Sequence, residues 1–402
     1  MSGGSGVAAP PVTATRFPCF DGLRAIAASS IVVFHVASTT GSTTQPRYGH
    51  YLARLDVGVA VFFVVSGFLL YRPFAAAHLG AKPSPRWRDF WWRRALRIYP
   101  AYWVALTAAI VLFRSTDLHG FADYARHYAL VQIYWRHYGL SGIVPAWTLA
   151  VELSFYAALP LYAGLLARAT RSRAAANHPS GALVTEAAAV ALLYACGLGV
   201  RAWLFFTSRP GTPSAQWLPA QLDLFALGIG LAVFSAARSS GQTARVTDPI
   251  ARSARWLGDH PAVSWALSAA AFVAVCNIGL HTDFAVGRYQ RKQEMAHQIL
   301  YGLTAFFLVV PAVFGPQERG VARRLLRSRL LTSIGIVSYG VFLWHYDWIK
   351  QLVDFGLLRH VHALRFPVLL AAAAVLTLVT AALSWFLVER PALAYKNRPP
   401  LR

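Results

Sequence analysis

Residues 20–36 read FDGLRAIAASSIVVFHV, a stretch that is apolar enough to cross a membrane yet carries a cation and an imidazole. Arg24 and His35 fall within about 20° of each other around a helix, because their spacing is close to three full turns. They are then roughly 16 Å apart along the helix axis. Ionisable groups at membrane depth usually face a bundle interior or a water-filled cavity. This face therefore predicts a polar passage through the bilayer.

The composition of the 402-residue chain is that of a membrane protein. Apolar residues make up 56% of it and charged residues 13%, whereas soluble domains carry about 25% charged residues. Ten stretches have about the 20 residues that a helix needs to cross the hydrocarbon core. We expect spans at about 20–39, 55–72, 98–114, 147–167, 183–206, 217–237, 262–280, 297–315, 331–351 and 366–389. The segment 118–135 leaves room for a short re-entrant helix.

The distribution of Lys and Arg predicts the orientation of these spans. With the N-terminus in the cytoplasm, the inner segments hold 24 of the 38 Lys and Arg residues and the outer segments hold 13. Positive charge concentrates in cytoplasmic loops, so both termini are predicted to be cytoplasmic. The same rule explains the net charge of +22, so this charge does not indicate a nucleic-acid partner. The three cysteines show no metal-ligand spacing, and their odd number gives no disulfide framework.

Residues 16–392 are predicted to form one all-α transmembrane domain, with about ten helices in a single bundle. Residues 1–15 are mostly Gly, Ser, Ala, Pro and Thr, a composition typical of disorder. Residues 393–402 are expected to form a cytoplasmic tail. No stretch between the spans is long enough to bury a core of its own. Any chemistry is therefore expected inside the bundle or at its faces.

Arg94 and Arg97 belong to a basic, tryptophan-rich segment where the third span begins on the cytoplasmic side. They are three positions apart, so they share a helix face. A guanidinium group suits a phosphate clamp because its planar fork bonds phosphate oxygens in pairs. The structural alternative is a set of interfacial cations beside an aromatic belt. Ser66 lies in a run with small residues that equally suit helix packing.

Three further ionisable residues are expected in the outer half of the membrane. They are His35, Glu152 about five residues inside its span, and His345 near the outer end of its span. The structural alternatives are a histidine hydrogen-bonded in the core and a carboxylate paired with an arginine. We also expect Asp21 to pair with Arg24. Cations in the inner half suit a phosphorylated donor that enters from the cytoplasm and ends near His35. A neutral imidazole can take a proton from a hydroxyl at physiological pH.

Taken in order, these motifs resemble the membrane-bound acyltransferase family 3, bacterial enzymes that O-acylate sugars, envelope polymers and antibiotics. The resemblance covers about residues 17–392. It rests on Arg24 with His35, Phe-Phe-x-x-Ser-Gly-Phe at 62–68, Arg94 with Arg97, Trp147 with Glu152, the Ser-Tyr-Gly run ending at His345, and Glu-Arg-Pro at 389–391. It implies acetyl-CoA or another acyl-CoA as co-substrate, and transfer of the acyl group across the membrane to an acceptor hydroxyl. It also implies that Arg24 and His35 are essential, with His35 as base or acyl relay.

The chain is thus predicted to be an integral-membrane O-acyltransferase of the bacterial cell membrane that uses no metal. Its acceptor is expected to be a glycan or glycolipid, or else a glycosylated small molecule such as a macrolide-type antibiotic, and a homo-oligomer is left open. A transporter or flippase of a phosphorylated solute and a non-catalytic scaffold are the alternatives from other classes. The expected catalytic residues are His35, Arg24 and Glu152, and the expected substrate-binding or donor-binding residues are Arg94, Arg97, Asp21, Ser66, Trp147 and His345.

Overall fold

The computed structural model describes residues 17–135, 141–175, 181–207, 213–241, 247–278, 291–359, 361 and 364–397. Within these ranges every regular element is a helix, and no strand is present. The prediction of an all-helical membrane protein is confirmed at this level. The expected disordered tail, residues 1–15, lies outside the described residues, as do residues 398–402 of the expected C-terminal tail.

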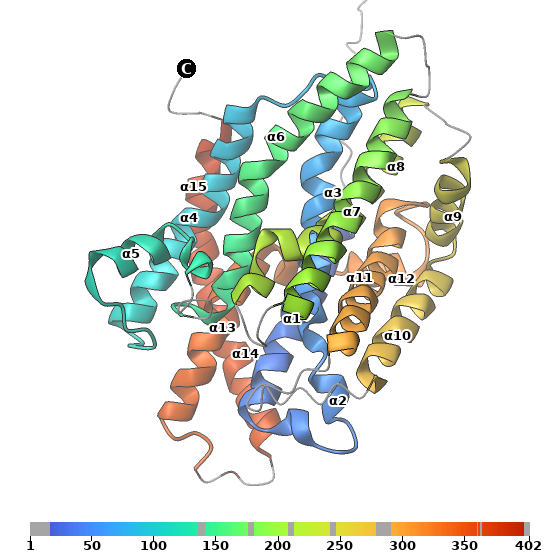
Figure 1. Ribbon diagram of the computed structural model, residues 1–402. Helices are drawn as coiled ribbons and strands as arrows, with labels where there is room; N and C mark the ends of the chain where they lie inside the picture. Colours follow the sequence, from blue (N-terminus) through green and yellow to red (C-terminus); the bar gives the residue numbers. More distant parts are fainter. Residues whose placement is uncertain are drawn as a thin grey trace, which may run out of the picture.

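Ten long helices form the bundle in the described ranges. They are α1 (Phe20–Thr39), α3 (Gly58–His78), α4 (Trp87–Val111), α6 (Trp147–Ala175), α7 (Gly181–Thr207), α8 (Leu222–Ser240), α10 (Pro261–Asn277), α11 (Arg291–Val313), α13 (Arg329–Asp354) and α14 (Arg365–Ser384). The shorter α-helices are α2 (Gly49–Leu52), α5 (Gly120–Tyr128), α9 (Asp248–Asp259), α12 (Val321–Leu326) and α15 (Arg390–Ala394). In Figure 1 the connection between α1 and α3 lies at the lower end of the bundle and that between α3 and α4 at the upper end.

Each expected span coincides with one of these long helices, and α5 lies where a short helix was expected. Seven of the described helical segments are long and apolar enough to cross a membrane, or up to eight if α9 and α10, bent by 100°, form one broken span. Helices α4 and α13 have 25 and 26 residues but are not among the seven, because polar residues interrupt their apolar runs. The number of ten spans and the side on which the termini lie remain predictions.

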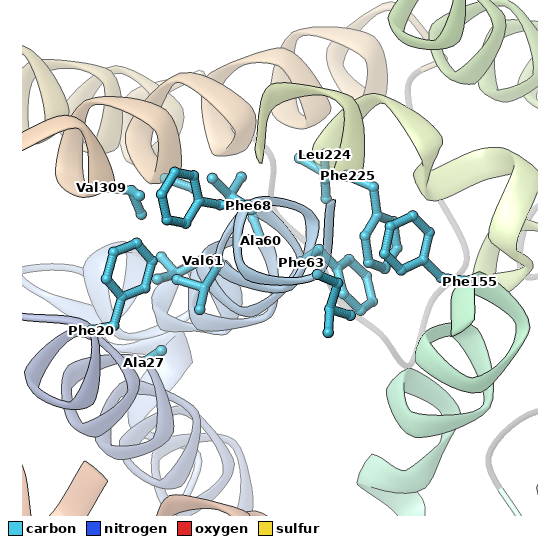
Figure 2. Close-up of a cluster of buried hydrophobic side chains, with 14 of the residues drawn as sticks. Phe20, Ala27, Ala60, Val61, Phe63, Phe68, Phe155, Leu224, Phe225 and Val309 are labelled. Carbon is cyan, nitrogen blue, oxygen red and sulfur yellow. The ribbon is translucent and has the colours of Figure 1, made fainter. Parts of the chain in front are cut away.

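Helix α3 is at the centre of the largest buried apolar cluster. Figure 2 shows Phe20 and Phe68 on one side of it and Phe63, Phe155 and Phe225 on the other. The Phe20 and Phe68 rings stack with centroids 5.1 Å apart, and the Phe155 and Phe225 rings stack at 4.0 Å. The core therefore fixes the rotation of α3, and with it the direction in which Ser66 points.

Glycines bring α3 and α8 into backbone contact. A Cβ atom on Gly67 would collide with the backbone of Phe225, and one on Gly228 would collide with the backbone of Val64 and Phe68. Small residues let helices approach closely in lipid, where packing rather than water exclusion drives association. The packing interpretation of the small residues in this stretch of α3 is therefore correct.

Gly228→Val is expected to destabilise the protein by about 1–3 kcal/mol, the usual cost of forcing extra methyl groups into a packed site. The matched control is Gly199→Val in α7, because a Cβ atom on Gly199 meets no other atom within 4 Å. Thermal unfolding of the purified protein in detergent measures both variants. Equal melting temperatures for the two would contradict the close approach.

Candidate active site

A cavity of about 800 Å³, counting its open mouth, lies between α1, α3, α4, α6 and α13. Its polar lining consists of Arg24, Ser66, Arg94, Arg97, Thr148, Glu152, Tyr156, Ser338 and Tyr339. We call it the arginine cavity. Five residues that sequence analysis assigned to the site thus meet in one place, although they come from four different helices.

The carboxylate of Glu152 is held by two hydroxyl groups in this cavity. Ser66 Oγ donates a hydrogen bond to Oε1 at 2.6 Å, and Tyr156 Oη donates to Oε2 at 3.0 Å. The small hydroxyl of Ser66 is therefore part of the polar site, next to the glycine that packs α3 against α8. Tyr156 was missed in the sequence, although its position four residues after Glu152 places it on the same helix face.

Glu152 does not group with the two histidines as expected: it contacts Ser66 and Tyr156 and lines the cavity that holds the guanidinium groups, and its depth in the membrane remains a prediction. The segment before α6 is buried, with Ile143 and Ala146 exposed by 1% and 0%. Glu152, in the second turn of α6, lies beside Ser66 of α3, to which it is hydrogen-bonded. The carboxylate faces the guanidinium groups, so it does not have the imidazole as its partner.

The three guanidinium groups of the arginine cavity have fewer ion-pair and hydrogen-bond partners than they could use. Arg97 Nη1 forms an ion pair with Glu389 Oε2 at 3.3 Å, and its guanidinium lies 5.5 Å from the ring centroid of Tyr339. Among the described residues, the Nε atoms of Arg24 and Arg94 are buried and have no hydrogen-bond partner. Leaving a buried donor unsatisfied costs about 1–3 kcal/mol, and more for a charged group. These N–H groups are therefore suited to an anionic ligand.

Asp21 and Trp147 do not join this arrangement. Within the described part of the chain no ion pair links Asp21 to Arg24, so the predicted pair is absent. The backbone of Asp21 instead packs against Gly335 of α13, where a Cβ atom would collide with it. Trp147 packs edge-on against Phe63, with the ring centroids 6.5 Å apart, and is not among the residues that line the cavity.

His35 and His345 lie beyond the arginine cavity. Their ring centroids are 5.2 Å apart, and the ring of Tyr346 stands edge-on to His35 at 5.0 Å. Phe342 lies between the two regions, because it lines the cavity and its ring centroid is 6.1 Å from that of His345. Phe342 also packs edge-on against Phe62, another lining residue, at 6.3 Å. We call Phe62 and Phe342 the aromatic pair.

The site therefore has cations and a carboxylate on one side of the aromatic pair and two imidazoles on the other. Helix α1 contributes Arg24 to the first part and His35 to the second. Among the described residues, no group of three or more His, Cys, Asp and Glu side chains could hold a metal ion. The chemistry that these side chains offer is anion binding followed by proton transfer or nucleophilic attack at an imidazole.

Comparison with known proteins gives the family. The model of the acyltransferase domain family (acyltransferase 3) matches residues 17–388. The putative peptidoglycan O-acetyltransferase YrhL of Bacillus subtilis is 26% identical over 393 residues, which cover 93% of this chain and 54% of that protein. Nodulation protein 10 of Rhizobium leguminosarum is 25% identical over 94% of each chain. Acyltransferase MdmB of Streptomyces mycarofaciens is 25% identical over 85% of this chain and 81% of its own.

The chain thus spans about half the length of YrhL but nearly all of nodulation protein 10. No solved structure matches. The family model covers nearly all of the described helices, and these include several that are apolar enough to span a bacterial inner membrane. The chain therefore belongs to the acyltransferase 3 family of multi-pass membrane proteins and is an acyltransferase.

Proposed function

We propose that the protein transfers an acyl group, most simply acetyl, from cytoplasmic acyl-CoA to a hydroxyl of a carbohydrate-containing acceptor on the other side of the membrane. The observation that carries this proposal is the placement of Arg24 in a cationic cavity and of His35 beyond it on the same helix. The cavity offers buried N–H groups to a phosphorylated donor. His35 is partly exposed, and it lies where the reactive end of such a donor would arrive.

A second hollow, of about 750 Å³, extends the arginine cavity toward the start of α4. The two share Leu69, Leu70 and Arg94, and the second adds Arg86 and Arg93. Coenzyme A carries its phosphates at one end and its thiol at the other. We infer that the phosphates bind along α4 and that the thioester arm follows the arginine cavity toward the aromatic pair.

At His35 the reaction needs one proton transfer and one acyl transfer. As a base, the neutral imidazole removes the proton of the acceptor hydroxyl, and the oxygen attacks the thioester carbonyl. The carbon–sulfur bond then breaks, and the thiolate of coenzyme A takes the proton as the ester leaves. As an acyl relay, His35 itself attacks the thioester, and the hydroxyl then attacks the acyl-imidazole. Both routes yield the same ester and free coenzyme A.

Glu152 acts on the donor side in this proposal. Its hydrogen bonds with Ser66 and Tyr156 fix it among the guanidinium groups. A carboxylate there keeps Arg24 and Arg94 in place and limits the excess positive charge when no donor is bound. Glu152 is then not a partner of the imidazoles, with which the sequence analysis grouped it.

The names of the relatives support a glycan acceptor. YrhL is described as a putative peptidoglycan O-acetyltransferase, and OatA of Listeria monocytogenes as a peptidoglycan O-acetyltransferase. A cell-surface glycan or glycolipid is therefore the first acceptor to test, and a glycosylated small molecule is the second.

His35→Ala is expected to lower acyl transfer by about 10²–10⁴-fold, the contribution of a positioned acid or base. The assay uses the protein in liposomes, with labelled acetyl-CoA on one face and glycan acceptors on the other. Thermal unfolding in detergent checks that the variant is folded. Full transfer by folded His35→Ala would refute the role of His35. Movement of a solute without consumption of acetyl-CoA would support a transporter instead.

Arg94→Ala is expected to raise the donor KM by about 10–100-fold, because hydrogen bonds to charged groups contribute about 1.5–3 kcal/mol. Arg94→Lys should recover only part of this loss, since an ammonium group cannot bond two phosphate oxygens as a planar fork does. Steady-state kinetics with varied acetyl-CoA measure both variants. An unchanged donor KM in Arg94→Ala would exclude the clamp.

Arg93→Ala is expected to raise the KM for acetyl-CoA by about two- to fivefold, because an exposed ion pair contributes about 1 kcal/mol or less. It should leave the KM for S-acetylpantetheine unchanged, since that donor lacks the nucleotide. Arg88→Ala is the matched control, because Arg88 is an exposed cation on the same helix that does not line the second hollow. Equal effects of the two substitutions would place the nucleotide elsewhere.

A further inference from the structure

His345 differs from an ordinary buried histidine in having one unused nitrogen. It is fully buried on α13, and its Nδ1 lies 3.0 Å from the carbonyl oxygen of Val341. A carbonyl oxygen can only accept, so Nδ1 carries the hydrogen. In the neutral ring Nε2 is then a hydrogen-bond acceptor. Nε2 is buried and has no partner among the described residues.

His127 provides the contrast within the same protein. It is also fully buried, but its Nδ1 bonds with the carbonyl oxygen of Asp123 at 2.8 Å and its Nε2 with Ser141 Oγ at 2.8 Å. Buried polar atoms are normally satisfied in this way. Among the described residues, His297 Nε2 is also buried without a partner, but the ring of His345 is the one that lies beside His35, so its unused Nε2 can take a partner from the proposed reaction centre.

His35 is the group placed to be that partner. Its ring centroid lies 5.2 Å from that of His345, and the two ring planes are tilted by 48°. The ring of His345 also contacts that of Phe342, which has no polar hydrogen to donate. His345 is held by its bond to Val341, whereas His35 is partly exposed. Catalytic hydrogen bonds are often long before substrate binds and tighten in the complex.

Two carboxylates come into question as partners of His35, and each already accepts a hydrogen bond from a hydroxyl group, although Asp347 Oδ2 is buried and has no partner among the described residues. Glu152 is bound by Ser66 and Tyr156 in the arginine cavity. Asp347 is two residues beyond His345, about 200° around the helix, and accepts a hydrogen bond from Ser115 Oγ at 2.7 Å. A neutral imidazole can orient a second imidazole without the cost of a buried charge in the resting state.

We propose that His345 is a positioning residue for His35. Its Nε2 accepts the N–H of one His35 nitrogen, which leaves the other nitrogen with its lone pair toward the reacting group and supports the imidazolium that forms. This inference rests on the proposed function of His35. It replaces the donor-binding role that the sequence suggested for His345.

The test uses two substitutions that keep the bulk of the side chain. His345→Phe removes the acceptor, whereas His345→Gln keeps an oxygen near the place of Nε2. We expect His345→Phe to lower kcat by about tenfold or more, within the range that a positioned base contributes, with a donor KM within about twofold of the wild type. His345→Gln should recover most of the kcat. His127→Gln is the matched control for removal of a buried imidazole, and it should lower thermal stability but not kcat.

The outcomes separate the two levels of the proposal. Full activity in His35→Ala would refute the proposed function itself. An inactive His35→Ala together with a wild-type kcat in His345→Phe would overturn only the positioning role. A raised donor KM with unchanged kcat in His345→Phe would overturn it as well, in favour of donor binding. Equal losses of kcat in the Phe and Gln variants would show that the imidazole acts only through packing.

Discussion

Three guanidinium groups buried in one cavity set the condition that the rest of the site must meet. A buried cation is tolerated only with compensating charge and hydrogen bonds. Glu389 supplies both to Arg97, and Glu152 adds a second carboxylate held by Ser66 and Tyr156. Two carboxylates face three cations, and two Nε–H groups remain without partners. The cavity thus has unused hydrogen-bond donors and excess positive charge, which is the physical basis for proposing a phosphorylated donor.

The close packing of the helices serves this arrangement. Gly67 and Gly228 let α3 touch α8, so Ser66 points from a rigid helix toward Glu152. Gly335 lets α13 touch α1, which sets His345 beside His35. In a membrane the glycines contribute geometry rather than water exclusion, since lipid tails are as apolar as the side chains. The positions of the polar groups therefore depend on residues that take no part in the chemistry.

The sequence predicted the helices well, because apolar stretches of about 20 residues directly reflect the thickness of the bilayer. It also predicted that Arg24 and His35 share a face, since that follows from helical periodicity alone. It grouped Glu152 with the imidazoles, whereas the side chain contacts Ser66 and Tyr156, because helix-to-helix contacts are not visible in local periodicity. The partner of Arg97 is Glu389, 292 positions away in the chain. A pattern of neighbouring residues in the sequence cannot reveal an ion pair between residues so far apart in the chain.

The aromatic pair of Phe62 and Phe342 has a further consequence for the cell. Phe342 contacts both regions, since it lines the arginine cavity and its ring lies 6.1 Å from that of His345, and Phe62 packs edge-on against Phe342 from the cavity side. A continuous wet path would conduct protons and dissipate the membrane potential. The cations lie on one side of Phe342 and the neutral imidazoles on the other. In the proposed reaction only an uncharged acyl group has to pass these rings, while the phosphates of the donor stay with the guanidinium groups.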